Sequence, residues 1–386
     1  MEKLSEKHTF LISLILGFIF LAVFPYIVWL LKPTQPLQVW ILDNTVPTKD
    51  YREHKGLMWV LNHFKMNNEL AGREFQYDTD YYGFFPVSKD NYHIRQLPMG
   101  DVSPDLIYIA DTYGVYQEDY FADNLKGDRS SLIYGGLSET DLLKIEKKLR
   151  KYMTLIAEFN SLASPTSTDV RGRLEGLTGI SWSGWIGRYF VDLTQGKEVP
   201  EWLVINYEKQ YGEKWEFRGP GIAFVSEDDQ VMILLQGLDI GSGGIAFSLE
   251  KSFEQEFSVQ EPIPYYYWFE FVQPEKNTET IASYHLDVTE SGLSKLKQIG
   301  LETTFPAIVR KKTDDFTSYY FASDFADNNK VPQWWQYWGI DIWKKWTTLD
   351  IKGQTDFFYW HGYVPIMKKI LADIKLQQAQ VGKTQY

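Results

Sequence analysis

An uncharged apolar run from Thr9 to Leu31 constrains this chain more than any other feature. At about 1.5 Å rise per residue, a helix of this length crosses a hydrocarbon core about 30 Å thick. The run is longer than the core of a cleaved signal peptide, and no small-residue cleavage pattern follows it at Trp29–Pro33. A buried core helix is the alternative, but the run is long and close to the terminus. The sequence therefore predicts an uncleaved transmembrane signal-anchor over residues 9–31.

The charges that flank this run predict its orientation. Lys3 and Lys7 precede the run, and Lys32 is the only basic residue between the run and Asp43. By the positive-inside rule, we expect residues 1–8 to form a cytoplasmic tail and the large domain to be extracytoplasmic. The absence of cysteine fits such a domain in a bacterial cell envelope, and it excludes disulfides, a cysteine nucleophile and a thiolate metal site.

Composition narrows the possible partners. A formal net charge of −12 argues against nucleic acid, whose binding requires basic patches. Aromatic residues make up 16% of the chain, which fits either a large, well-filled core or a surface that stacks sugar rings. The six histidines have no metal-binding spacing, and no phosphate-binding glycine loop or nucleophile elbow occurs. We therefore expect no metal and no cofactor.

The order of apolar runs predicts an α/β fold. Between residues 38 and 215, buried strands alternate with amphipathic helices, which is typical of a mainly parallel sheet flanked by helices. After Gly219-Pro220-Gly221 the strands follow one another more closely, and the chain is expected to end in helices over 332–345 and 363–380. Residues 216–386 are therefore interpreted as a β-rich part with C-terminal helices. Either a separate domain or a continuation of one large sheet fits this pattern.

Acidic residues follow several predicted strands. Asp43, Asp111 and Glu158 each end a buried strand, Asn160 comes two residues later, and Asp324 follows a late strand. Parallel strands end at one edge of a sheet, where ligands of open α/β sheets bind. We therefore expect these five residues to line one site together with Arg188, with Asp111 and Glu158 as the catalytic pair if the protein is an enzyme. Turn-forming or helix-capping roles are the alternative for each.

A second candidate lies in the segment 181–190. Trp182 and Trp185 could stack a flat ligand, and Arg188 could hold its polar groups, since glycines between and after them permit close approach. The alternative is a tight turn with buried aromatic rings and an arginine paired to an acid. Five further tryptophans cluster between residues 334 and 346, where core packing or contact with a membrane interface fits better than a cofactor site.

Part of this chain resembles the class I glutamine amidotransferase-like domain, which has a flavodoxin-type fold. The resemblance lies in the strand ending at Asp43, the segment 106–113 and the strand-loop-helix over 155–171. The chain is also similar to membrane-anchored bacterial proteins with that domain. The family depends on a cysteine nucleophile in an elbow after a strand. Here Glu158-Phe159-Asn160 stands at the comparable position, so the resemblance implies the fold without amidotransferase activity.

Two functions fit these observations. The first is a membrane-anchored extracytoplasmic envelope protein that binds a glycan or a protein partner in the assembly or modification of surface polysaccharide. The second is a carboxylate-dependent hydrolase that processes glycans with Asp111 and Glu158. Carboxyl groups facing each other across an open aromatic-lined cleft favour the enzyme, whereas buried carboxyls capped by backbone N–H groups favour the binding protein.

Overall fold

A computed structural model gives the fold and describes residues 2–89, 91–100, 102–122, 124, 126–259 and 262–384, so Met1 of the predicted cytoplasmic tail lies outside it. Its helices are α1 (Glu2–Leu30), α2 (Arg52–His63), α3 (Gln117–Phe121), α4 (Glu139–Lys148), α5 (Thr168–Thr178), α6 (Glu201–Tyr211), α7 (Glu254–Phe257), α8 (Glu290–Gln298), α9 (Ile340–Thr347), α10 (Asp356–Phe358), the π-helix η1 (Tyr359–Tyr363) and α11 (Val364–Thr384).

The larger sheet has ten strands, in the order β15 (Ile263–Pro264), β14 (Ile240–Leu249), β17 (Thr278–Val288), β18 (Thr304–Lys312), β19 (Phe316–Phe321), β10 (Met153–Ala157), β7 (Leu106–Asp111), β2 (Val39–Asp43), β5 (Tyr82–Ser88) and β6 (Asn91–Arg95). A four-stranded sheet has the order β13 (Val231–Leu235), β12 (Gly221–Ser226), β11 (Ile180–Phe190) and β16 (Trp268–Pro274). The remaining strands form two small sheets, made of β1 (Gln35–Leu37), β3 (Met66–Asn68) and β4 (Arg73–Glu74), and of β8 (Val115–Tyr116) and β9 (Leu132–Tyr134).

The α/β class is confirmed, but the prediction of a mainly parallel sheet is wrong. Within the large sheet, only the four pairs that join β19, β10, β7, β2 and β5 are parallel. The other neighbours are antiparallel. Parallel neighbours need long crossovers, such as those through α2 and α4, whereas β18 and β19 are joined by the short turn at 313–315. The sheet is therefore parallel near its middle and antiparallel on both sides.

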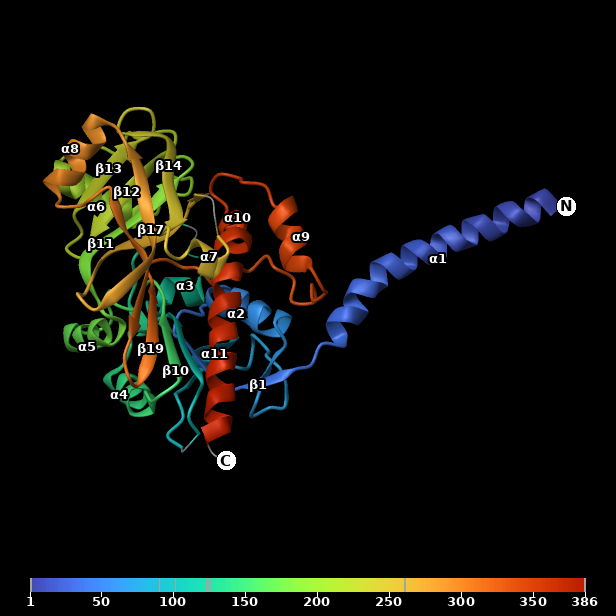
Figure 1. Ribbon diagram of the computed structural model, residues 1–386. Helices are drawn as coiled ribbons and strands as arrows, with labels where there is room; N and C mark the ends of the chain where they lie inside the picture. The colour runs from blue at the N-terminus through green and yellow to red at the C-terminus, as the bar shows by residue number, and fades with distance from the viewer. Residues whose placement is uncertain are drawn as a thin grey trace.

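Helices cover both faces of the parallel strands (Figure 1). Side chains along β7 alternate, because Tyr108 packs on the side of α2 and α11, while Ile107 and Ile109 pack on the side of α4 and α5. Ser138 caps α4, since its hydroxyl accepts a hydrogen bond from the Asp141 N–H at 3.0 Å. This three-layer packing fixes where the carboxyl ends of the parallel strands lie.

The four-stranded sheet joins the large sheet at the end of β19. The Glu270 N–H of β16 donates to the Ala322 carbonyl at 2.9 Å, and an isolated bridge pairs Phe269 with Ser323. Strands from both parts of the chain, before and after residue 215, are neighbours in the ten-stranded sheet. The division at residue 215 stays a prediction.

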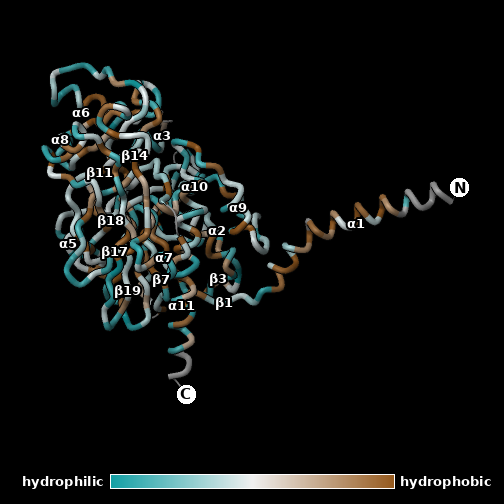
Figure 2. Tube along the Cα trace, turned by 45° about the horizontal axis from the view of Figure 1, so that its top comes forward, coloured by the Kyte–Doolittle hydropathy of each residue, from teal (hydrophilic) through white to brown (hydrophobic). Residues whose placement is uncertain are grey.

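The first helix, α1, is long and apolar enough to cross a membrane. An apolar window of 18 residues within its segment Phe10–Leu30 has a mean hydropathy of 2.6, and no residue of that window is buried inside the protein. It projects away from the rest of the chain as an apolar rod (Figures 1 and 2). Near its end, Trp29 is buried and its indole N–H donates to the His63 carbonyl at 3.0 Å. The last turn of α1 is therefore packed against α2.

Candidate functional site

The predicted acidic residues gather at one edge of the large sheet. Asp43 ends β2, Asp111 ends β7, Glu158 follows β10, and Asp324 follows β19. These strands are neighbours and run parallel, so their carboxyl ends meet at the same edge. All four side chains are buried. They differ in how many hydrogen bonds they accept.

Asp43 has a structural partner on each oxygen. Its Oδ1 accepts from the Thr45 N–H at 2.9 Å, and its Oδ2 lies 2.5 Å from His54 Nδ1. The other ring nitrogen of His54 lies 2.7 Å from the Tyr77 carbonyl. Both ring nitrogens therefore face oxygen acceptors, and neither is left to act on a ligand.

Asp111 is held by three donors. Its Oδ1 accepts from the Thr45 hydroxyl at 2.5 Å and from the Tyr113 N–H at 2.6 Å, and its Oδ2 accepts from the Asn160 amide at 3.0 Å. Burial raises the pKa of Asp111 to about 7 in spite of these hydrogen bonds, and the nearby charge of Asp43 acts in the same direction. Asn160, in the left-handed conformation with φ 62°, orients this carboxyl group.

Glu158 points into the core. One oxygen accepts from the Tyr108 hydroxyl, which also lies 3.0 Å from the Tyr363 hydroxyl. The other oxygen accepts from the Ala326 N–H at 3.3 Å. Burial raises the pKa of Glu158 well above its usual value, which favours the neutral form.

Asp324 differs from these three, because its Oδ1 is buried without a hydrogen-bond partner. Ligand atoms of Asp324, Asp327 and Glu53 lie within 4.8 Å of one another, so these three carboxyl groups could hold a cation. Burial, and then the charges of Asp111 and Asp327, raise the pKa of Asp324 well above its usual value. We call Glu53, Asp324 and Asp327 the acidic triad.

Arg52, at the start of α2, closes one side of the acidic triad. Its guanidinium donates to both oxygens of Asp327, and its Nε lies 3.3 Å from a Glu53 oxygen. It also donates to the Tyr267 hydroxyl at 2.5 Å. This bidentate geometry is the strong form of an arginine–carboxylate pair, and it leaves Asp324 as the triad member with an unpartnered oxygen.

Arg188 lies on the aromatic side of the same site. Its guanidinium carbon is 4.7, 5.2 and 5.5 Å from the ring centres of Phe190, Tyr267 and Trp268. Its Nε is buried without a hydrogen-bond partner, and its carboxylate contact is with half-exposed Glu198 at 3.7 Å. Burial lowers the pKa of Arg188, yet an arginine stays charged at neutral pH. A charged guanidinium with so few hydrogen-bond partners is suited to bind an oxygen-rich ligand.

The rings beside Arg188 are partly open to solvent. Trp202 and Trp268 are stacked, with ring centres 6.3 Å apart, and both are half-buried. Trp268 is also stacked on buried Phe159, at 6.5 Å. Flat aromatic faces next to an arginine form a polar and apolar surface of the kind that sugar rings contact. We call Arg188, Trp202, Tyr267 and Trp268 the aromatic rim.

Trp182 and Trp185 do not join Arg188 in one surface. Trp182 packs with the apolar cluster on the side of α4 and α5, and the Arg171 guanidinium lies 4.9 Å from its ring centre. Trp185 packs with the cluster on the other side of the sheet. A register shift in β11 between Trp182 and Ile186 separates this part of the strand from Arg188. The alternative, a tight turn with buried aromatic rings, does not describe this segment either, because residues 180–190 form one strand with a bulge, and Trp182 and Trp185 are half-buried.

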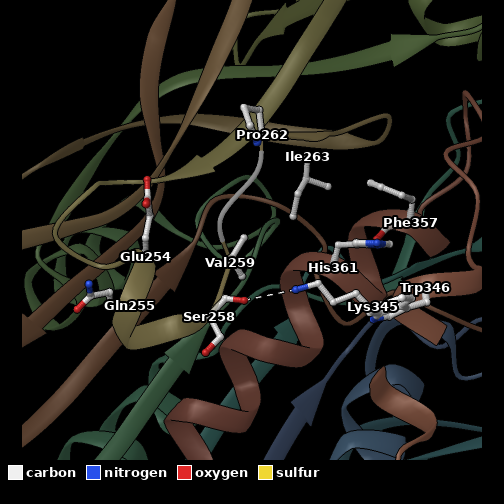
Figure 3. A pocket seen from close by; sticks show the side chains of 10 residues that line it. All are labelled: Glu254, Gln255, Ser258, Val259, Pro262, Ile263, Lys345, Trp346, Phe357 and His361. Carbon is white, nitrogen blue, oxygen red and sulfur yellow. Dashed lines mark hydrogen bonds between the residues drawn. The ribbon is translucent and has the colours of Figure 1, made fainter. Parts of the chain in front are cut away.

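Several residues of the site were not among those predicted from the sequence. Arg52 and Glu53 begin α2, while Tyr267 precedes β16 and Trp268 begins it, far from the other members in the chain. Two local signals pointed to such residues: the acidic spacing of Asp324 and Asp327, and the aromatic run 265–268. The pocket in Figure 3, of about 750 Å³, lies elsewhere, between α7, α9 and η1.

No protein-family model and no curated protein matches this chain. Among solved structures it is similar to the carbohydrate deacetylase Agd3, with TM-score 0.34, 10% identity, and coverage of 75% of this chain and 30% of that one. A cytoplasmic protein from Salmonella typhimurium LT2 matches with TM-score 0.38, 10% identity, and coverage of 88% and 99%. A beta-galactosidase from Bacillus circulans sp. alkalophilus matches with TM-score 0.27, 10% identity, and coverage of 75% and 30%.

The chain thus spans less than a third of the length of Agd3 and of the beta-galactosidase. At these identities and TM-scores, the similarities carry no argument about activity. The resemblance to glutamine amidotransferase-like domains stays a prediction. The function must be argued from the site itself.

Proposed function

We propose that this protein is a membrane-anchored, extracytoplasmic envelope protein that binds a glycan at the aromatic rim. The observation that carries the proposal is Arg188, a largely buried guanidinium over aromatic rings, with an Nε that has no hydrogen-bond partner. Burying a charged donor without hydrogen bonds is costly, and a bound oxygen acceptor would offset that cost. Sugar hydroxyl and carboxylate groups are such acceptors, and they would meet the part of the guanidinium that is open to solvent, since the Arg188 side chain is 20% exposed. The neighbouring rings would stack the C–H face of the sugar.

Binding is better supported than hydrolysis by Asp111 and Glu158. Asp111 accepts three hydrogen bonds, and Glu158 is engaged by the Tyr108 hydroxyl and the Ala326 N–H. Both side chains are buried, so neither stands across an open cleft from the other. Buried and capped carboxyls are what we expect of groups that hold a binding site in shape.

The anchoring part of the proposal is supported by the length and exposure of α1. The basic residues before the span favour a cytoplasmic tail under the positive-inside rule. Protease added to intact spheroplasts should then digest the large domain, and a tag fused to residue 1 should stay protected. Full protection of the large domain in sealed spheroplasts would contradict this orientation.

Arg188→Gln tests the binding site, because it removes the charge and keeps most of the side-chain stem. The full-length protein, in nanodiscs, is applied to an array of purified bacterial surface polysaccharides. We expect the wild type to bind a subset of them and Arg188→Gln to lose that binding, with the melting temperature changed by no more than a few degrees. Arg173→Gln is the matched control, since Arg173 pairs with Glu146 on the surface between α4 and α5. Equal binding by both variants would rule out the aromatic rim as the site.

A further inference from the structure

The helix α9 is amphipathic, but most of its apolar side chains are exposed to solvent, whereas two of its charged side chains face the protein. Ile342, Trp343 and Trp346 are exposed, whereas Asp341 and Lys344 face the protein. Asp341 pairs with Lys368 at 3.2 Å, and the Lys344 ammonium lies 4.4 Å from the ring centre of Trp335. Charged residues of a soluble surface helix normally point outward. The apolar face of α9 therefore points away from the protein.

This face extends beyond α9 on both sides. Trp346 is 84% exposed, Trp334 76% and Leu349 74%, and the whole surface consists of Trp334, Trp338, Ile342, Trp343, Trp346, Leu349 and Ile351. We call these residues the tryptophan face. A contiguous exposed apolar surface of this kind marks an interaction site, whereas single exposed apolar residues are common on any protein. Trp346 also stands at the pocket of Figure 3, beside Lys345, whose ammonium donates to the Ser258 carbonyl at 3.4 Å.

The position of the tryptophan face relative to α1 identifies what covers it. The backbone N–H of Trp338 donates to the carbonyl of Pro25 at 2.9 Å, and Pro25 lies five residues before the end of α1. At 1.5 Å rise per residue, that contact lies about 7 Å inside the end of the span. In both views α9 lies beside the end of α1, and in Figure 1 it runs across the direction of α1. With α1 spanning a bilayer, as proposed above, a helix in this position would lie along the bilayer surface.

We infer that the tryptophan face is inserted into the membrane interface, where it holds the large domain against the bilayer in a fixed orientation. Tryptophan is enriched at this depth, because its ring is apolar and its N–H bonds to the headgroup region. Short amphipathic helices bury such faces at the boundary between headgroups and acyl chains. The last turn of α1 is packed on α2 through Trp29, with the Lys65 ammonium 3.4 Å from its ring centre, and Pro25 of α1 contacts Trp338 of the face, so the end of the span is in contact with both. This inference rests on the proposed anchoring by α1.

The absence of cysteine allows a direct test with single fluorescent labels. Full-length Trp346→Cys, labelled with a nitrobenzoxadiazole dye, is placed in phosphatidylcholine nanodiscs with and without brominated acyl chains. We expect a blue-shifted emission that bromine quenches. Leu238→Cys is the exposed control on the turn before β14, far from α1, and its emission should be neither shifted nor quenched.

Ile19→Cys, in the middle of α1, separates the two proposals. Quenching at position 19 without quenching at position 346 would overturn the inference and leave the anchoring intact. No quenching at position 19 would overturn the anchoring itself. A blue shift at position 346 without bromine quenching would show that protein covers this face, which also overturns the inference.

An independent observation concerns the acidic triad. Asp324 is 6% exposed, its Oδ1 has no hydrogen-bond partner, and ligand atoms of Glu53 and Asp327 lie within 4.8 Å of its own. Five carboxyl groups interact here, those of the triad with Asp111 and Glu158, whereas the nearby cations are Arg52 and Arg188. Such an excess of buried acids is unfavourable unless protons or a cation neutralise it.

We propose that the acidic triad binds a divalent cation that prefers oxygen ligands, such as Ca²⁺ or Mg²⁺. Glu53 enters from the start of α2, while Asp324 and Asp327 come from the segment after β19, so the cation would tie α2 to the end of the sheet. Arg52 donates to both oxygens of Asp327 and offsets part of the negative charge of the site. This proposal does not depend on glycan binding.

Calcium and magnesium are titrated into the metal-free full chain by calorimetry, and terbium serves as a luminescent probe that Tyr267 can sensitise. We expect binding by the wild type and a loss of at least tenfold in affinity in Asp324→Asn, because the variant removes one charge from the site. Asp314→Asn, at an exposed turn between β18 and β19, should bind as the wild type does. Absence of binding by the wild type, or equal affinity in Asp324→Asn, would overturn the proposal.

Discussion

Asp239 and Asp324 are both buried aspartates, yet their surroundings are opposite. Asp239, in the turn between β13 and β14, accepts from the Leu235 N–H at 2.9 Å, from the Ser291 hydroxyl at 2.7 Å and from the Lys295 ammonium at 2.7 Å. Asp324 has a buried oxygen without any donor. Burial alone would raise the pKa of both. At Asp239 the hydrogen bonds outweigh burial and the pKa lies below its usual value, whereas at Asp324 nearby acids raise it further.

The difference separates a carboxylate that stabilises the fold from one that does not. A buried charge with three donors is compensated within the protein, so its removal should cost stability. A buried carboxyl group without donors is uncompensated. Proteins retain such an unfavourable buried group mainly at functional sites, where a ligand supplies the missing partner. The same substitution at both positions tests this interpretation.

The largest effect is expected from Asp239→Asn. The variant removes the charge that Lys295 and two other donors surround, so we expect it to lower the free energy of unfolding by about 3 kcal/mol. Chemical denaturation of the detergent-solubilised chain measures this value. A change below about 1 kcal/mol, the usual size for an exposed ion pair, would mean that Asp239 behaves as a surface residue.

A pH-dependent loss of stability is expected from Glu270. Burial raises its pKa from 4.5 to about 7, the nearby charge of Asp111 acts in the same direction, and the Tyr320 hydroxyl, the Asn160 N–H and the charge of Arg171 oppose the shift. The folded state therefore binds the proton more tightly than the unfolded state does. The stabilisation from this group is present below the unfolded pKa and is lost as the pH rises through about 7.

Glu270→Gln isolates this effect, since the amide cannot ionise. Between about pH 5 and about pH 8, we expect the wild type to lose about 2 kcal/mol more of its unfolding free energy than the variant does. Denaturation at several pH values measures the difference. Parallel curves for the two proteins would show that Glu270 does not titrate in this range.

A smaller effect of opposite sign is expected from Asp324→Asn in the absence of divalent cations. The variant replaces a buried carboxyl group, whose charged form is disfavoured by burial and which has an unpartnered oxygen, with an amide that cannot ionise. The free energy of unfolding should therefore stay the same or rise by up to about 1 kcal/mol. Adding calcium should make the wild type more stable to unfolding than Asp324→Asn, because only the wild type is stabilised by binding the cation. A loss similar to that of Asp239→Asn would abolish the contrast between the two aspartates.

The smallest effect is expected from Arg173→Gln. Its guanidinium Nε lies 3.0 Å from a Glu146 oxygen, but the pair is partly open to solvent. Exposed ion pairs contribute little to stability, so the melting temperature should not change within error. A clear decrease would show that pairing between α4 and α5 matters more than the exposure of these residues implies.

The sequence predicted the features that depend on neighbouring residues. The apolar run gave α1, the strands before Asp43, Asp111 and Glu158 were found with the right direction, and Ser138 marked the start of α4. The shared edge of Asp43, Asp111, Glu158 and Asp324 followed from one rule about parallel strands. The late helix expected from residue 332 begins only at Ile340, after Gly339 in the left-handed conformation.

Other features depend on contacts that no local pattern encodes. The alternation along β11 did not reveal the register shift that separates Trp182 from Arg188, because a bulge is set by the partner strand. Tyr267 and Trp268 reach the site through the pairing of β16 with β11. Likewise, the spacing of tryptophans in α9 was visible in the sequence, but whether their face would point inward or outward was not.

The sequence by itself therefore determined the apolar span, the main helices and strands of the first part, and the acidic ends of the parallel strands. These depend on side-chain periodicity and on backbone preferences over a few residues. Only the tertiary structure decided which carboxyl groups have hydrogen-bond partners, which aromatic rings surround Arg188 and which way the tryptophan face points. Those properties arise from donors and rings that are distant in the chain, and their positions are fixed when the two sheets and the helices pack together.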